Sequence, residues 1–211
     1  MSLVLRIAIF IQIAVLVATF ANFIIQYNLL EAIRGGEFSS RTEMLAAANA
    51  GDTRVRFLAA LAFPALAFAV VALLFWVYRV TANAHARGAE GLSASAGLAV
   101  AYFFIPFANI VMPGKVLSEV ERAGRSPSNW RQLKTWMVIP LWWATWIIMN
   151  LAGLALSRLP IGPGIDALEQ FVAINIGYKV LELIAYALTL VVAVRITRLQ
   201  RQSSIDVEAF A

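Results

Sequence analysis

The chain has no cysteine and only one histidine, His85. Without cysteine it can form no disulfide bond, no catalytic thiolate and no cysteine-ligated metal site. One histidine cannot build a His-rich metal centre or a bis-histidine haem within a single chain. We therefore expect no metal and no cofactor.

Charged residues are also scarce. They make up 14% of the 211 residues, whereas 61% are hydrophobic, and soluble domains contain about 25% charged residues. Several apolar runs reach the roughly 20 residues that a bilayer core requires. These features indicate a multi-span membrane protein, with membrane lipids as partners. The net charge of +5 then fits basic residues at cytoplasmic span ends, and no nucleic acid is expected as a partner.

We predict an all-α integral membrane protein that forms a single membrane domain over residues 1–211. The fold has four full transmembrane helices and a proline-broken segment, which is either re-entrant or a short fifth span. The predicted full spans cover residues 3–30, 55–80, 133–157 and 168–194, and the interrupted segment covers 97–112.

The interrupted segment contains Pro106 and Pro113. Proline removes a backbone donor and clashes with the preceding turn, which disfavours an unbroken helix through 106–113. Short surface helices are expected at 41–50 and 114–123. The first has a capping box at Ser40 and Glu43 and is expected to end at Gly51. The tail, residues 203–211, is expected to be flexible.

The positive-inside rule is compatible with two topologies. One has five spans with the N-terminus outside, and the other has four spans with both termini inside. Both place the C-terminus in the cytoplasm, and the proline break favours the second.

Polar residues lie near the middle of the last span. Asn175, Lys179 and Glu182 are spaced four and three apart and share one helical face. A charge at mid-bilayer costs at least about 2.5–3.5 kcal/mol, so such groups pair or line a cavity. We expect them to face the Gln12–Thr19–Asn22 side of the first span, or Asn150. They form either a neutralised pair that locks the bundle or a solute, ion or proton site.

Two further clusters are candidates. The structural polar cluster consists of Arg79, Asn83, Asn109 and Glu119, with an ion pair predicted between Arg79 and Glu119. Trp142 and Trp146 are four residues apart and share a face. That face either contacts a lipid or flat ligand or belongs to packing and the interfacial aromatic belt.

Four motifs occur in order: W-x-x-R-x-x-x-N, F-I-P-F-A-N-I-x-x-P, E-V-E-R-A and W-W-A-T-W. Their residues are Trp76, Arg79, Asn83, Pro106, Asn109, Pro113, Glu119, Arg122, Ala123, Trp142, Trp143 and Trp146. Over about 70 to 200 the chain resembles a bacterial multi-span membrane family, the domain of unknown function forty-three twenty-eight. The chain departs from the family at Glu121, where tryptophan is common, and at Gly114, where an aromatic is common. The resemblance implies a bacterial inner membrane and carries no activity.

We expect a non-enzymatic interaction or assembly module for another membrane protein or for a second copy of the chain. The alternative is a small-solute, ion or proton carrier or channel that uses Asn175, Lys179 and Glu182. An enzyme is not expected, because the sequence offers no nucleophile–base pair and no metal cluster. Solvent access to Lys179 discriminates between the two functions.

Overall fold

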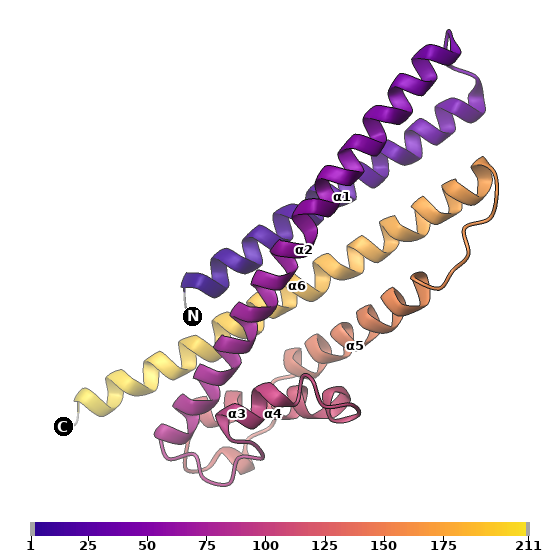
Figure 1. Ribbon diagram of the computed structural model, residues 1–211. Helices are drawn as coiled ribbons and strands as arrows, with labels where there is room; N and C mark the ends of the chain where they lie inside the picture. The colour runs from indigo at the N-terminus through magenta and orange to yellow at the C-terminus, as the bar shows by residue number, and fades with distance from the viewer. Residues whose placement is uncertain (1–2, 210–211) are drawn as a thin grey trace. The chain divides into compact units, whose positions relative to one another are not determined.

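The structure is a computed structural model that describes the backbone of residues 3–209 and the side chains through Gln202. Its elements (Figure 1) are α1 (Leu3–Gly35), α2 (Arg41–Ala86), α3 (Ala96–Ala101), α4 (Ala108–Arg125), the 3₁₀ helix η1 (Trp130–Gln132), α5 (Val138–Leu156) and α6 (Ile165–Ala209). Residues 3–209 contain no β-strand, which confirms the predicted all-α class. Residues 210–211 and the side chains after Gln202, where the flexible tail was predicted, lie outside this description.

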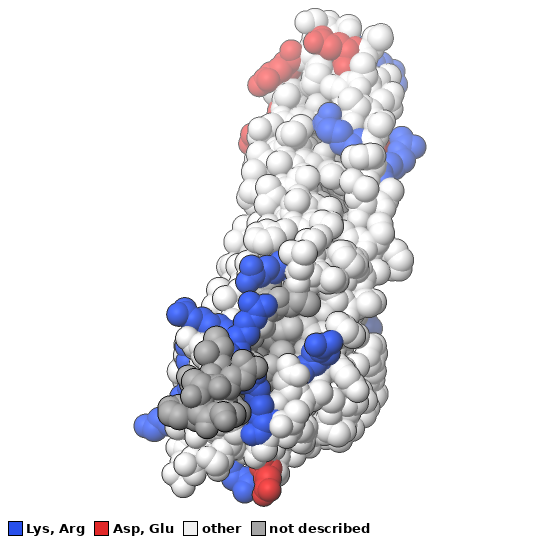
Figure 2. Space-filling model, turned by 90° about the vertical axis from the view of Figure 1, so that its left-hand side faces the viewer, with Lys and Arg blue, Asp and Glu red and all other residues white. Residues whose placement is uncertain are grey.

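Within the described residues, α1, α2, α5 and α6 are long and apolar enough to cross a membrane. A helix satisfies its own backbone hydrogen bonds, which lipid cannot do. Many of their large apolar side chains point outward, for example Phe63, which is 76% exposed. Much of the face drawn in Figure 2 accordingly carries no Lys, Arg, Asp or Glu. A solvent-exposed apolar surface of this extent is typical of lipid contact.

The predicted surface helix at 41–50 is wrong as a separate element, because α2 runs without interruption from Arg41 to Ala86. Its start is as predicted: the Ser40 hydroxyl accepts a hydrogen bond from the Glu43 N–H at 3.2 Å. Gly51 does not end the helix. It is buried within α2, and a side chain there would lie 3.8 Å from Leu29. A glycine in a helix costs only about 1 kcal/mol relative to alanine, which the packing outweighs.

The predicted interruption is present, and its centre is Phe107. Helix α3 ends at Ala101 and α4 begins at Ala108. Between them Phe107 has a φ of 64°, in the left-handed region, and is 85% exposed. Pro113 does not break the chain, because it lies buried inside α4. Helix α4 therefore loses one backbone hydrogen bond at Pro113 and still continues.

The predicted surface helix at 114–123 belongs to α4 and is mostly buried. Val116, Leu117 and Val120 form its apolar side, as expected, but Gly124 also packs inward. A Cβ atom on Gly124 would lie 3.2 Å from the Cβ of Leu199 in α6. A small residue such as Gly124 extends the buried face of α4, because it allows the neighbouring helix to approach closely.

The chain divides into two compact units, which we describe separately. Unit 1 comprises Met1–Ile9, Ala69–Ile147 and Ala185–Ala211, and unit 2 comprises Phe10–Phe68 and Ile148–Ile184. Unit 1 contains α3, α4 and η1 and has fully buried side chains such as Leu117, Ile139 and Trp142. Unit 2 contains the cavity described below.

Candidate functional site: a polar-walled cavity in unit 2

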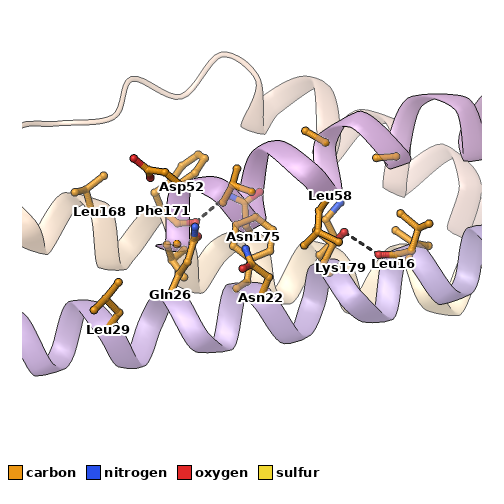
Figure 3. Close-up of a pocket in the computed structure, with 18 of the residues that line it drawn as sticks. Leu16, Asn22, Gln26, Leu29, Asp52, Leu58, Leu168, Phe171, Asn175 and Lys179 are labelled. Carbon is orange, nitrogen blue, oxygen red and sulfur yellow. Dashed lines mark hydrogen bonds between the residues drawn. The ribbon is translucent and has the colours of Figure 1, made fainter. Parts of the chain in front are cut away.

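Segments of α1, α2 and α6 line a partly open cavity of about 960 Å³ in unit 2 (Figure 3). Ligand pockets in proteins usually measure about 300–1,000 Å³, so the cavity is large enough for a small molecule. Most of its wall is apolar, with side chains such as Leu16, Phe23, Leu58, Phe63 and Val172. A minority of polar side chains interrupts this apolar surface, and they come from all three helices.

The α1 wall carries the polar face that the sequence spacing predicts, since Gln12, Thr19, Asn22 and Gln26 all line the cavity. The Thr19 hydroxyl donates to its own helix, to the carbonyl of Val15 at 2.8 Å. The Asn22 Oδ1 accepts a hydrogen bond from Arg54 Nε at 3.4 Å. Gln12 is only 5% exposed, and its Oε1 has no hydrogen-bond partner among the described residues. An unpaired buried acceptor is costly, so Gln12 is ready to receive a donor.

The α6 wall carries Asn175, Lys179 and Glu182, and all three line the cavity as the sequence predicts. Lys179 Nζ lies 2.5 Å from Glu182 Oε2. The two side chains keep 18% and 16% of their surface exposed. Asn175 Nδ2 donates to the carbonyl of Phe171 at 2.8 Å. The ion pair is therefore present, and it lies opposite the polar face of α1; the alternative partner Asn150 does not line the cavity.

The cavity continues to the first turns of α2, where Ala48 and Asp52 line it. Asp52 is exposed, and its side chain is drawn with Phe171 and Lys179 in Figure 3. Sequence reasoning missed Asp52 because it placed this residue in a loop, between the predicted surface helix at 41–50 and the span predicted to start at residue 55. Near the same end of unit 2, Arg34 of α1 forms ion pairs with Asp166 and Glu169 of α6. These pairs join α1 to the start of α6.

The predicted structural polar cluster does not assemble. The Arg79 guanidinium lies 5.9 Å from the ring centroid of Phe75, and Asn109 is exposed. The Glu119 carboxylate accepts from the Ser93 N–H at 2.7 Å. The predicted Arg79–Glu119 ion pair is not among the ion pairs of the described residues. A charged side chain at a helix end has several potential hydrogen-bond and ion-pair partners. Sequence spacing alone does not determine which of them tertiary packing brings close.

Asn83 instead joins the end of α2 to α6. Its Nδ2 donates to Gln200 Oε1 at 3.3 Å, and Gln200 Nε2 donates to the Val80 carbonyl at 2.7 Å. Arg87, just beyond α2, donates to the Gln200 carbonyl. Burial lowers the pKa of Arg87 from its ordinary value. Gln200 therefore connects the backbone and side chains of α2 to α6 within unit 1.

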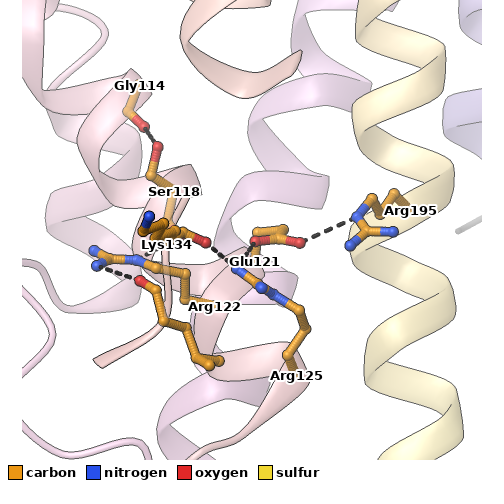
Figure 4. A network of polar contacts seen from close by, with 8 residues as sticks. Gly114, Ser118, Glu121, Arg122, Arg125, Lys134 and Arg195 are labelled. Carbon is orange, nitrogen blue, oxygen red and sulfur yellow. Dashed lines mark hydrogen bonds and ion pairs between the residues drawn. The ribbon is translucent and has the colours of Figure 1, made fainter. Parts of the chain in front are cut away.

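The buried ion pairs of unit 1 centre on Glu121 rather than Glu119 (Figure 4). Glu121 is 0% exposed and lies 3.0 Å from both Arg125 Nη2 and Arg195 Nε. The Arg195 guanidinium also lies 4.6 Å from the ring centroid of Trp136. The spacing of Glu121 and Arg125, four residues apart on one helix, is a signal for this pair that the sequence does contain.

Residues 40–198 match the model of the family described as Domain of unknown function (DUF4328). The chain belongs to this family. No curated protein and no solved structure matches the chain significantly. The DUF4328 region contains the Lys179–Glu182 pair and the Glu121 ion pairs, whereas α1, with its polar face, precedes it.

In this DUF4328 protein the tryptophan stripe is packed inside unit 1. Trp142 is 1% exposed, and its indole N–H donates to the Thr189 hydroxyl at 2.8 Å. The indole of Trp146 donates to the same hydroxyl at 3.0 Å. The candidate aromatic lipid or ligand face is therefore wrong for Trp142, which has almost no surface to offer. Gly114 makes room for a third ring, because a Cβ there would lie 2.7 Å from Trp143 Cδ1.

Proposed function

We propose that this DUF4328 protein is a non-enzymatic carrier that binds a small solute in the cavity of unit 2. We place it in a bacterial inner membrane with its C-terminus in the cytoplasm. The observation that supports binding is the continuity of the cavity. It extends from Asp52, near the charged start of α2, to Lys179 and Glu182 in an apolar stretch of α6. Intramembrane charges normally pair, line a cavity or mark a solute path, and here they do the first two.

The chemistry of the wall suits binding rather than bond breaking. It offers carboxamides, one hydroxyl, the exposed carboxylate of Asp52 and an ion pair, with apolar side chains between them. A few polar groups on an apolar wall orient a ligand and select it. Gln12 and Asn175 supply amide groups from opposite helices, and Lys179 keeps donors that Glu182 does not use.

An assembly module is the second candidate, and one observation favours it. Lys179 and Glu182 neutralise each other at 2.5 Å, which satisfies much of their polarity without any ligand. Several spans also expose large apolar side chains, for example Phe10, Val71 and Leu151. Such surfaces can pack against another membrane protein or a second copy as well as against lipid.

A cavity-filling substitution tests the carrier proposal. The full chain is purified in a mild detergent, and native mass spectrometry records its mass and any bound small molecule. Ala62 lines the cavity, so Ala62→Trp should fill it. Ala67 lies on the same helix, is exposed and does not line the cavity, so Ala67→Trp is the matched control. We expect a bound molecule in the wild type and in Ala67→Trp, and its loss in Ala62→Trp.

The opposite result identifies the second candidate. If the wild type carries no small molecule but retains a stoichiometric protein partner, and Ala62→Trp keeps that partner, the carrier proposal fails and the assembly module replaces it. Equal loss of a bound molecule in both tryptophan variants would also reject the cavity as its site.

A further inference from the structure

The described side chains of unit 1 carry an excess of positive charge that the proposed cavity does not explain. Among the side chains described in this unit, Lys and Arg far outnumber the acids, which are Glu90, Glu119 and Glu121. Glu119 and Glu121 are buried. Glu90 is therefore the one exposed carboxylate among the described side chains of unit 1. Figure 2 shows Lys and Arg gathered on part of the face that it draws.

The exposed cations that matter here are Arg131, Lys134 and Arg198, and none of them is in an ion pair of the described residues. The guanidinium of Arg131 donates to the backbone carbonyls of Glu90 and Gly91, both at 3.4 Å, and lies 5.4 Å from the ring centroid of Trp130. The buried Glu121 is already held between Arg125 and Arg195. The side chains described through Gln202 therefore supply no ionic partner for these three cations, which leaves them available to an external anion.

An exposed apolar surface lies on the same segment of chain. Phe104 is 67% exposed, Phe107 is 85% exposed and Val111 is 61% exposed. They cover the turn before α4 and its first residues, whereas Arg131 and Lys134 follow the end of α4 and Arg198 lies in α6. A segment with apolar side chains at one end and cations at the other suits the boundary between acyl chains and headgroups. A water-soluble acidic partner or a nucleic acid would not bury the exposed apolar side chains.

We propose that Arg131, Lys134 and Arg198 bind the headgroups of anionic phospholipids, while Phe104, Phe107 and Val111 insert among the acyl chains. Clusters of Lys and Arg beside a membrane span attract anionic lipid through its negative surface potential. The Glu121 ion pairs help by fixing α4 against α6, the two elements that lead into this surface. This inference is independent of the cavity and of its ligand.

The experiment measures lipid preference on the full chain. The protein is purified in a zwitterionic detergent and offered equal amounts of phosphatidylglycerol and phosphatidylcholine. Native mass spectrometry then counts the bound lipid of each kind. The test variant combines Arg131→Gln, Lys134→Gln and Arg198→Gln. The matched control removes the same charge from exposed residues of unit 2, with Arg41→Gln, Arg56→Gln and Arg158→Gln.

We expect the wild type to prefer phosphatidylglycerol, and the test variant to lose that preference by about ten-fold. The control should keep it, and added salt should weaken it because salt screens exposed charges. Equal loss in both triple variants would mean that only total charge matters, which overturns the proposal. So would a wild type without preference, or full competition by soluble glycerol phosphate, which would indicate a phosphate site. If the triple variant does not fold by circular dichroism, Lys134→Gln and Arg198→Gln are measured singly against Arg41→Gln.

Discussion

Lys179 and Glu182 are opposite charges 2.5 Å apart on the wall of a cavity inside a span. Removing one of these charges leaves the other unpaired in an apolar setting. Removing both leaves no unpaired charge. Lys179→Met and Glu182→Gln should each lower the free energy of unfolding by about 1–3 kcal/mol. This is less than the about 3–5 kcal/mol of a fully buried pair, because both side chains keep some exposure. The double variant should lose less than the sum of the two.

Thermal unfolding in detergent, followed by circular dichroism, measures these losses. Lys115→Met is the control, because Lys115 is an exposed lysine in α4 and forms no ion pair among the described residues. It should leave the unfolding temperature nearly unchanged. Strict additivity of the two single losses would show that the pair contributes no coupling.

Spacing alone predicts which residues of one helix share a face, and here it succeeds. Asn175, Lys179 and Glu182 line the cavity together, and so does the α1 face with Gln12. Spacing does not predict partners on other helices. Glu119 accepts from a backbone N–H rather than from Arg79, and Glu121 takes the buried ionic role. The contact of Glu119 with Ser93 and the pair of Glu121 with Arg195 join segments far apart in the chain, which no local pattern encodes.

At the scale of elements, α4 packs directly against α6. An ideal Cβ at Gly124 lies 3.2 Å from the Cβ of Leu199, and disulfides join Cβ atoms about 3.8 Å apart. Gly124→Cys combined with Leu199→Cys should therefore form a disulfide after a shift of a few tenths of an ångström. The chain has no other cysteine to compete. Mass measurement before and after reduction detects the bond.

Lys115→Cys with Leu199→Cys is the control pair. Lys115 is exposed and lies on α4 about 13 Å along the axis from Gly124. Oxidation should leave this pair reduced. A disulfide that forms equally well in both pairs would contradict the packing of α4 against α6.

The sequence predicts long helices better than their ends. Apolar length identifies α1, α2, α5 and α6, because a bilayer requires about 20 apolar residues. It misplaces the start of α2, because Gly51 only weakly destabilises a helix and the packing around it offsets that destabilisation. It places the break correctly within 106–113, where Phe107 has a positive φ. It extends the break too far, because Pro113 remains inside α4.

For the molecule as a whole, four spans with both termini in the cytoplasm place the turn after α1 outside. The five-span alternative places that turn inside. Glu37 is exposed in this turn, so Glu37→Cys distinguishes the two. We expect a membrane-impermeant maleimide to label it in intact cells. Ser128→Cys, exposed between α4 and η1, should be labelled only after lysis.

Labelling of both cysteines only after lysis would support the five-span arrangement. The outcome also affects the cavity. With four spans and both termini inside, the Asp52 end of the cavity lies on the same side as the turn after α1. A solute would then enter the cavity from outside the cell.

All six tryptophans of the chain lie between Trp76 and Trp146, and this range falls within unit 1. Two of them share the Thr189 hydroxyl, so their emission is sensitive to the packing of α5 against α6. Unit 2 has no indole of its own. Intrinsic tryptophan fluorescence therefore reports on unit 1 alone. We expect a solute that fills the cavity of unit 2 to leave the emission spectrum unchanged.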